Sequence, residues 1–252
     1  MKMAVAGGTG LAGRHVVREL TERGHEVAVL ARAHGVDLVA GTGVDEALAG
    51  CDVVVDASNV TTQSADTSIG FFEAATRNLL EAERRAGIAH HVALSIVGID
   101  RVPIGYYAGK RRQEALIDAG DVPFTILRAT QFHEFAGQIL ERTRKGPIAL
   151  VPRMRSQPIA VREVAGLLAD AAVDAPGGLL DDVAGPRVEQ MVDKARQLLR
   201  ARGARTVVVP VRLPGAGGRA MRDGGLLPIG SGARGTETFD DWLAGPDAAP
   251  WT

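Results

Sequence analysis

The sequence predicts an α/β protein in which a parallel sheet carries helices on both faces. Strand-like and helical apolar patterns alternate through the first half of the chain. One strand, 52–57, is a nearly continuous valine run ("DVVVDA"), which is typical of a strand covered on both sides. A glycine-rich loop follows the first strand. The length of 252 residues suits a single domain over 1–252, with a core over 1–135 and substrate-pocket elements plus a C-terminal helix over 136–252.

Apolar periodicity and turn residues give the expected elements in order. The strands of the first half are expected at 2–6, 26–31, 36–40, 52–57, 89–95 and 122–128. The helices between them are expected at 11–23, 44–49, 67–87 and 106–119. In the second half we expect helices at 135–145, 161–172, 189–201 and 238–244, and strands within 148–161, at 179–183 and at 206–211. Glycine and arginine dominate 215–235, where we expect little order.

Composition restricts the partners. The net charge of -1 gives no reason to expect nucleic acid or an acidic membrane as a partner. No apolar run is long enough to span a bilayer, and the N-terminus leads directly into a strand. We therefore expect a cytoplasmic protein, monomeric or homodimeric, that binds a small molecule and no metal. The single cysteine, Cys51, precedes an apolar strand and is expected to be a buried, inert thiol.

The loop "GGTGLAG" carries the strongest binding signal. Its glycines fall at Gly7, Gly10 and Gly13, between a strand and a helix. Such spacing allows backbone N–H groups to approach a pyrophosphate at the helix N-terminus. We expect these glycines, with Thr9 and Leu11, to bind a dinucleotide; the alternative is a tight turn without a ligand.

Arg32 stands near the end of the second strand, where an NAD site usually has an acid. A guanidinium pairs well with a 2′-phosphate, so the sequence predicts NADP(H). The alternative is a solvated surface arginine, and Asp37 nearby would complicate the assignment if the strand ended later.

Four segments together resemble a known family: "AVAGGTGLAGRHVV", "DVVVDASN", "HHVALSIVG" followed by "YYAGKRRQE", and "PFTILRATQFHEF". They resemble the atypical short-chain dehydrogenase/reductase proteins, especially the NmrA-like, NAD(P)H-binding branch. The resemblance implies a Rossmann-type doubly wound parallel sheet with a small C-terminal substrate-binding region. It also implies that Ala57 and Ser58 lie along the adenine ribose, and that the nicotinamide is flanked by Ala129, Thr130 and Phe132.

The same resemblance implies an active site. In reductases of this superfamily a tyrosine donates a proton to a carbonyl, a lysine four residues later holds the nicotinamide ribose, and a serine binds the carbonyl oxygen. Tyr106, Lys110 and Ser95 match these roles in order. A free tyrosine titrates near 10, and a nearby ammonium favours its phenolate. The substrate pocket is expected to include Tyr107, Gln131, His133 and Phe135, although a lone histidine such as His133 is more often a hydrogen-bonded structural residue.

Three functions fit these residues. The first is an NADP(H)-dependent oxidoreductase that reduces a ketone, quinone or aromatic polyketide-like carbonyl by hydride transfer, with Tyr106 as proton donor. The second is a non-catalytic NADP(H)-binding redox sensor. The third is epimerase or monooxygenase chemistry on the same scaffold. The tyrosine–lysine pair favours the first.

Overall fold

The computed structural model describes residues 1–248, and these form two compact units whose segments alternate along the chain. The first unit comprises 1–96, 104–128 and 161–181. The second comprises 97–103, 129–160 and the described residues from Asp182 onward.

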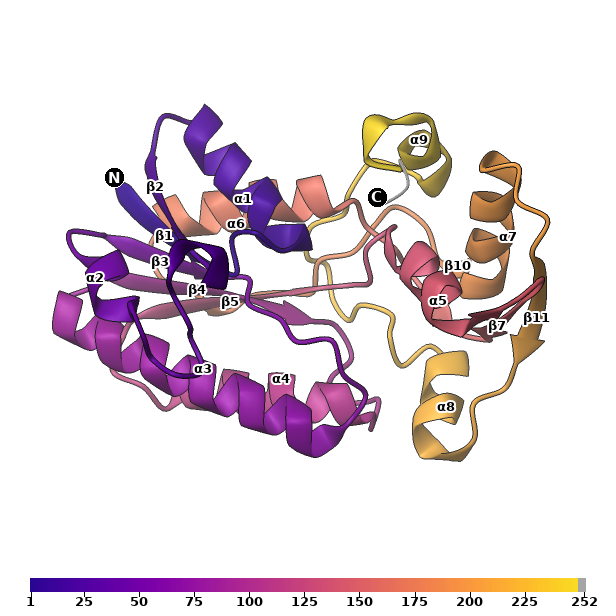
Figure 1. Cartoon of the computed structure of the whole chain (residues 1–252), viewed down its shortest axis with the longest axis horizontal. Helices are drawn as coiled ribbons and strands as arrows, with labels where there is room; N and C mark the ends of the chain where they lie inside the picture. The colour runs from indigo at the N-terminus through magenta and orange to yellow at the C-terminus, as the bar shows by residue number, and fades with distance from the viewer. Residues whose placement is uncertain (249–252) are drawn as a thin grey trace. The chain divides into compact units, whose positions relative to one another are not determined.

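A six-stranded sheet forms the centre of the first unit (Figure 1). In spatial order its strands are β2 (Glu26–Leu30), β1 (Lys2–Ala6), β3 (Val53–Asp56), β4 (His90–Ile96), β5 (Phe124–Ala129) and β9 (Gly178–Leu179). β1 pairs in parallel with β2 on one side and β3 on the other, so Ala4 lies between Ala28 and Val54. The strand order therefore reverses at β1, and in open sheets of this kind ligands bind outside the carboxyl ends of the strands at such a switch point.

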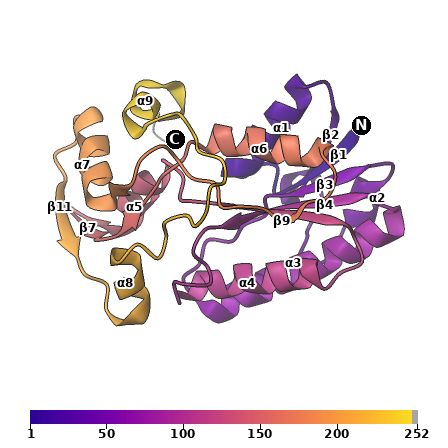
Figure 2. The ribbon, with the colours of Figure 1, turned by 180° about the vertical axis from the view of Figure 1, so that it is seen from behind.

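Helices cover both faces of this sheet (Figures 1 and 2). One face carries α1 (Leu11–Glu22) and α6 (Val161–Val173). The other carries α2 (Val44–Leu48), α3 (Ala65–Ala86) and α4 (Gly105–Asp118). The predicted Rossmann-type, doubly wound fold is confirmed.

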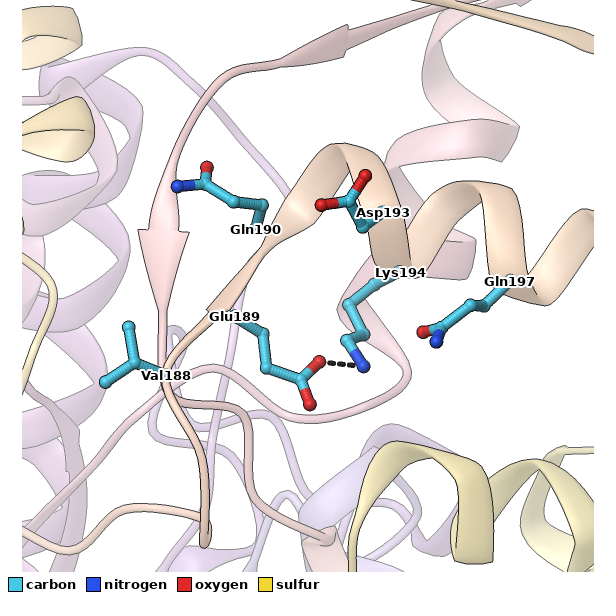
Figure 3. Close-up of a pocket in the computed structure, with 6 residues that line it drawn as sticks. All are labelled: Val188, Glu189, Gln190, Asp193, Lys194 and Gln197. Carbon is cyan, nitrogen blue, oxygen red and sulfur yellow. Dashed lines mark ion pairs between the residues drawn. The ribbon is translucent and has the colours of Figure 1, made fainter.

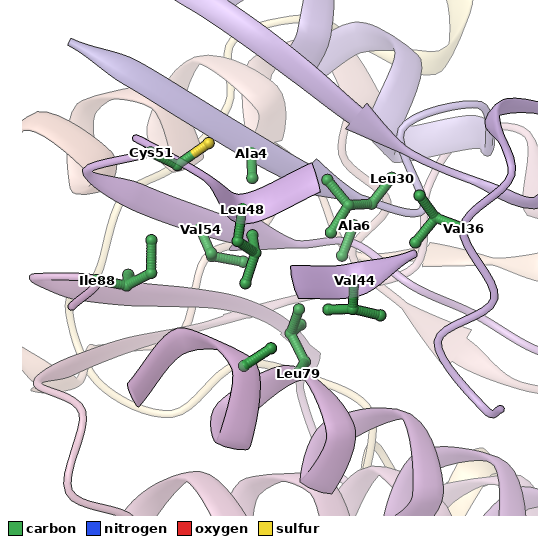
Figure 4. Close-up of a cluster of buried hydrophobic side chains, with 11 residues drawn as sticks. Ala4, Ala6, Leu30, Val36, Val44, Leu48, Cys51, Val54, Leu79 and Ile88 are labelled. Carbon is green, nitrogen blue, oxygen red and sulfur yellow. The ribbon is translucent and has the colours of Figure 1, made fainter. Parts of the chain in front are cut away.

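The core between the sheet and the helices α2 and α3 explains why the strands consist mainly of apolar residues (Figure 4). Ala4, Ala6 and Val54 point from the sheet toward Leu48 and Leu79 on the helices. Cys51 belongs to the same cluster and is 6% exposed. Burial raises the pKa of its thiol, so the expectation of a buried thiol is confirmed.

The prediction of a strand at 36–40 is wrong. The chain instead forms a short 3-10 helix, η1 (Arg32–His34), and then a turn closed by an isolated antiparallel bridge between Asp37 and Thr42. The Asp37 carboxylate accepts the N–H groups of Val39 and Ala40, which removes them from strand pairing. Three glycines with positive φ turn the chain here: Gly35, Gly41 and Gly43.

The second unit is built from short elements (Figure 2). A three-stranded sheet contains β11 (Val207–Val211), β7 (Ile148–Pro152) and β6 (Arg144–Lys145), and β8 (Arg155–Ser156) pairs with β10 (Glu189–Gln190). The helices of this unit are α5 (Phe135–Thr143), α7 (Met191–Ala201), α8 (Gly215–Arg222), α9 (Phe239–Ala244) and the 3-10 helix η2 (Pro246–Ala248).

Two of these helices bear on the sequence expectations. The predicted C-terminal helix is confirmed as α9, which begins with a capping box between Thr238 and Asp241. The expected lack of order over 215–235 is wrong for its first part, which forms α8. Gly218 packs so closely on the backbone of Leu213 that a Cβ there would lie 2.1 Å from the Leu213 oxygen, so glycine permits the helix. No helix within residues 1–248 is long and apolar enough to cross a bilayer.

Candidate active site

The glycine loop closes on itself at the carboxyl end of β1. The Gly7 N–H donates to Leu30 O at 2.9 Å, and the Gly10 N–H donates to Gly7 O at 2.9 Å. Gly7 has φ +70°, and a Cβ on Gly13 would lie 2.1 Å from Gly7 O. Glycine is therefore required at both positions for the loop and α1 to pack together.

The N-terminus of α1 has the character of an anion site. Its N-cap is Gly10, which offers no side-chain acceptor, and the first turn contains no acidic residue. The free N–H groups and the helix dipole therefore favour a negative ligand. The predicted phosphate contacts Gly7, Thr9, Gly10, Leu11 and Gly13 all lie in this loop and the start of α1.

Ala57 and Ser58 lie against the same loop. A Cβ on Gly7 would lie 2.8 Å from the Ser58 Cα and 2.9 Å from Ala57 O. The Ser58 N–H donates to the Asp56 carboxylate at 2.8 Å, which fixes the backbone where β3 ends. The Ser58 hydroxyl is buried and has no hydrogen-bond partner among the described residues.

Arg32 is the first residue of η1, two residues after the end of β2. Its side chain is exposed and makes no ion pair with the part of the chain that the structure describes. An uncommitted guanidinium at this strand end fits the 2′-phosphate of NADP, and it also fits a solvated arginine.

Tyr106 lies in the first turn of α4, and its hydroxyl donates to Asn59 Oδ1 at 2.6 Å. Asn59 follows Ser58 in the loop after β3, so the tyrosine faces the carboxyl end of the sheet. Ser95 is 2% exposed near the end of β4, and its hydroxyl has no partner among residues 1–248. Tyr107 is buried and packs at 6.0 Å from Tyr106 between ring centroids.

Lys110 is held by a chain of buried hydrogen bonds. Its ammonium donates to Leu94 O at 2.6 Å and to Gln113 Oε1. The Gln113 amide in turn donates to the Asp56 carboxylate at 2.8 Å. The ammonium also lies 4.7 Å from the centroid of the Phe72 ring. Because an ammonium has three N–H donors, one remains for a further acceptor such as a ribose hydroxyl.

The surroundings of Lys110 set its protonation. Burial lowers the pKa of Lys110 to about 8, although the Asp56 carboxylate acts in the opposite direction. A second buried pair lies nearby on the same sheet face, where His91 Nδ1 is 2.8 Å from Glu83 Oε1. Burial raises the pKa of Glu83, and Asp56 raises it further. Asp56 thus interacts with both buried groups.

The sequence analysis missed Asp56, Gln113 and Asn59. Gln113 follows Lys110 by three residues, so the helical period shows that both share one face of α4. No sequence pattern links Gln113 with Asp56, which is 57 positions earlier in the chain.

The predicted residues from Ala129 to Phe135 belong to the second unit. Thr130 Oγ1 donates to Gln157 O at 2.6 Å, and Phe132 pairs with Ile159 in an isolated bridge. His133 is 2% exposed, contacts Glu237 O through Nε2 at 3.2 Å and packs against Phe239. This enclosure matches a hydrogen-bonded structural histidine. The remaining members of the predicted set are Ala129 and Gln131, both buried, and the half-buried Phe135.

The second unit also contains a pocket of about 300 Å³ beside α7 (Figure 3). Lys194 and Glu189 form an ion pair within it. The Lys194 ammonium lies 4.6 Å from the Phe239 ring centroid, and burial lowers its pKa to about 8. These contacts join α7 to α9, so packing between the two helices explains why the Lys194 ammonium is buried.

A doubly wound sheet with an uncapped, glycine-rich helix start at the β1 end defines a dinucleotide-binding protein. The family described as NAD(P)H-binding matches residues 7–175, and the chain belongs to it. The resemblance to the atypical short-chain dehydrogenase/reductase proteins is thereby confirmed, and the fold is of the oxidoreductase type.

The chain is similar to three known proteins, described below. The chain is 30% identical over 205 residues to a chloroplastic divinyl chlorophyllide a 8-vinyl-reductase of Oryza sativa subsp. indica, covering 68% of this chain and 50% of that protein. It is 29% identical over 147 residues to the photosystem II assembly factor Ycf39 of Synechocystis sp., covering 52% of this chain and 45% of that protein. The chain thus spans about half the length of the curated relatives it matches. A crystal structure of a short-chain dehydrogenase/reductase superfamily protein from Agrobacterium tumefaciens with bound NAD has a TM-score of 0.70 at 18% identity, covering 98% of this chain and 96% of that one.

Proposed function

We propose that the protein is an NADPH-dependent reductase of a ketone, quinone or aromatic carbonyl, with Tyr106 as the proton donor. The observation that carries this proposal is the position of Lys110. Its ammonium is bonded to the carbonyl of Leu94, directly before Ser95, and it follows Tyr106 by one helical turn. The three predicted catalytic residues are thereby associated with the carboxyl end of one strand, where catalytic groups of open α/β sheets gather.

The cofactor would supply a hydride, and the chain's own residues would manage the proton. Tyr106 donates a proton to the carbonyl oxygen as negative charge develops there. The unpartnered Ser95 hydroxyl is available to donate a hydrogen bond to the same oxygen. Protonated Lys110 favours the phenolate of Tyr106, which makes proton release easier.

The preference for NADPH rests on Arg32. Its uncommitted guanidinium would bind the 2′-phosphate through paired hydrogen bonds, a contact that NADH lacks.

The decisive experiment screens NADPH consumption with quinones, ketones and aromatic carbonyls, and then compares two variants on the best substrate. We expect Tyr106→Phe to lower kcat about 100-fold or more, since general acid catalysis is typically worth that much. Tyr107→Phe is the comparison variant: because Tyr107 is expected to line the substrate pocket rather than to donate the proton, this variant should largely retain kcat and change mainly KM. Unchanged turnover in Tyr106→Phe would remove this residue from the mechanism.

A second candidate is a non-catalytic NADP(H)-binding module. The similarity to an assembly factor favours it. So does the hydrogen bond from Tyr106 to Asn59, which engages the hydroxyl of the proposed donor. NADPH binding without turnover on any substrate of the screen would support this second function.

A further inference from the structure

A pocket of about 570 Å³ in the second unit is rich in arginine. It is lined by Arg153, Arg196, Arg212 and Arg222, with Asp193 and Asp223 as the acidic members. Asp193, labelled in Figure 3, also lines the smaller pocket beside α7. The arginine pocket thus carries two more positive than negative groups, in a chain whose net charge is -1.

Two of the arginines are brought side by side by the sheet. β7 and β11 are parallel neighbours, and their last residues, Pro152 and Val211, are paired. Arg153 and Arg212 directly follow this pair, and the Arg153 N–H donates to Val211 O at 2.9 Å. Adjacent strands lie about 4.8 Å apart, so the two backbones are neighbours, and both arginines line the same pocket. Neither guanidinium makes an ion pair with any residue in the described part of the chain.

The other two arginines are only weakly neutralised. Arg222, at the end of α8, donates to the neutral carbonyl of Leu213 at 2.9 Å. Arg196, on α7, approaches one oxygen of Asp193 at 3.5 Å, a loose contact between exposed groups.

Four arginines from separate elements therefore line one pocket, with only two carboxylates to offset their charge. Scattered surface arginines have no reason to gather in this way, and their mutual repulsion is unfavourable. A bound anion would offset the repulsion, and the planar guanidinium fork suits phosphate oxygens especially well.

We propose that this arginine pocket binds a multiply phosphorylated small molecule. The number of arginines exceeds what one phosphate group can contact in paired fashion, and the volume leaves space for an organic portion. This site is built entirely from the second unit and does not depend on the proposed reductase activity.

The test is calorimetric titration of the whole protein with pyrophosphate and with inorganic phosphate at low salt. The pocket variant is Arg153→Gln with Arg212→Gln. The matched control is Arg200→Gln with Arg205→Gln, which removes the same charge from exposed positions of the same unit outside the pocket. Circular dichroism and thermal unfolding verify that both variants fold.

We expect saturable pyrophosphate binding by the wild-type protein, weakened roughly ten-fold or more in the pocket variant and less than about two-fold in the control. Inorganic phosphate should bind more weakly than pyrophosphate. The proposal is overturned by a lack of saturable binding, by equal weakening in both variants, or by unchanged affinity in the pocket variant. Equal affinity for the two anions would overturn the requirement for more than one phosphate group.

Discussion

Lys110 carries an ammonium group into a site where the residue is only 4% exposed. The cost of removing this charge from water is offset by two hydrogen bonds, the Phe72 ring and the nearby Asp56 carboxylate. The result is a lysine whose charge is retained near neutral pH but is easily lost above it. A charged group with this balance suits a position beside Tyr106, the proposed proton donor.

This balance makes stability depend on pH. The pKa of Lys110 is about 8 in the folded protein, against an ordinary lysine value of 10.5. Between these values the unfolded chain binds more protons, so the contribution of Lys110 to stability rises as the pH rises from about 8 to about 10.5. We expect urea unfolding at pH 7.5 and 9.5 to show a smaller gain in Lys110→Met than in the wild-type protein.

The control for this measurement is Lys145→Met, which removes an exposed lysine in β6. It should preserve the pH dependence of the wild-type protein. A Lys110→Met variant with the same pH dependence as the wild-type protein would contradict the role of burial.

At the scale of elements, the packing of α4 on α3 decides where Tyr106 and Lys110 lie. The contact is close because Gly109 faces Ser68 on α3. The Ser68 hydroxyl donates to Tyr106 O at 2.7 Å, which ties the start of α4 to the neighbouring helix. The position of the proposed catalytic helix therefore depends on a residue without a side chain.

Two glycine-to-alanine substitutions test this packing. A Cβ on Gly109 would lie 2.2 Å from Ser68 Oγ and 2.6 Å from its backbone carbonyl, so Gly109→Ala forces the helices apart. We expect a loss of roughly 1–3 kcal/mol in the free energy of unfolding. Gly70→Ala on α3 meets no atom within 4 Å and should stabilise the protein by up to about 1 kcal/mol. Urea unfolding measures the free energy of unfolding of both variants. An unchanged value for Gly109→Ala would show that α3 and α4 can move apart without cost.

The sequence predicts an element well when the signal is local. The valine run of β3, the glycine loop and the capping box of α9 each depend on neighbouring residues, and all three are present. The segment 36–40 has the apolar letters of a strand, but the side chain of Asp37 competes for its N–H groups and produces a turn. Local composition could not reveal that competition.

In the candidate site, too, residues that follow a local pattern are predictable from the sequence, and contacts between distant segments are not. Ser95, Tyr106 and Lys110 could be proposed from the sequence because they match a family pattern on one strand and one helix. The contact between Gln113 and Asp56 depends on how α4 packs over β3, which the order of residues does not specify.

At the scale of the whole molecule, dinucleotide binding should appear as added stability. The glycine loop, Ser58 and Arg32 all belong to the first unit, so a ligand there stabilises the folded state over the unfolded chain. At 100 times its Kd, NADPH should add about 2.7 kcal/mol to the free energy of unfolding. Thermal unfolding should show a larger shift with NADPH than with NADH at equal concentration.

Arg32→Ala provides the control for this preference. It should reduce the NADPH shift to about that of NADH while leaving the NADH shift intact, because only NADPH carries the 2′-phosphate. A preserved difference between the two nucleotides would mean that Arg32 does not select between them.

The thiol of Cys51 can serve as a native probe of how often the core of the first unit opens. As the chain's single thiol, enclosed with Leu48 and Val54, it is shielded from a water-soluble disulfide reagent while the core is closed. The rate of labelling would therefore report how often this core opens, without an engineered probe. Slower labelling in the presence of NADPH would measure, from the interior, how strongly a ligand at the sheet edge suppresses those openings.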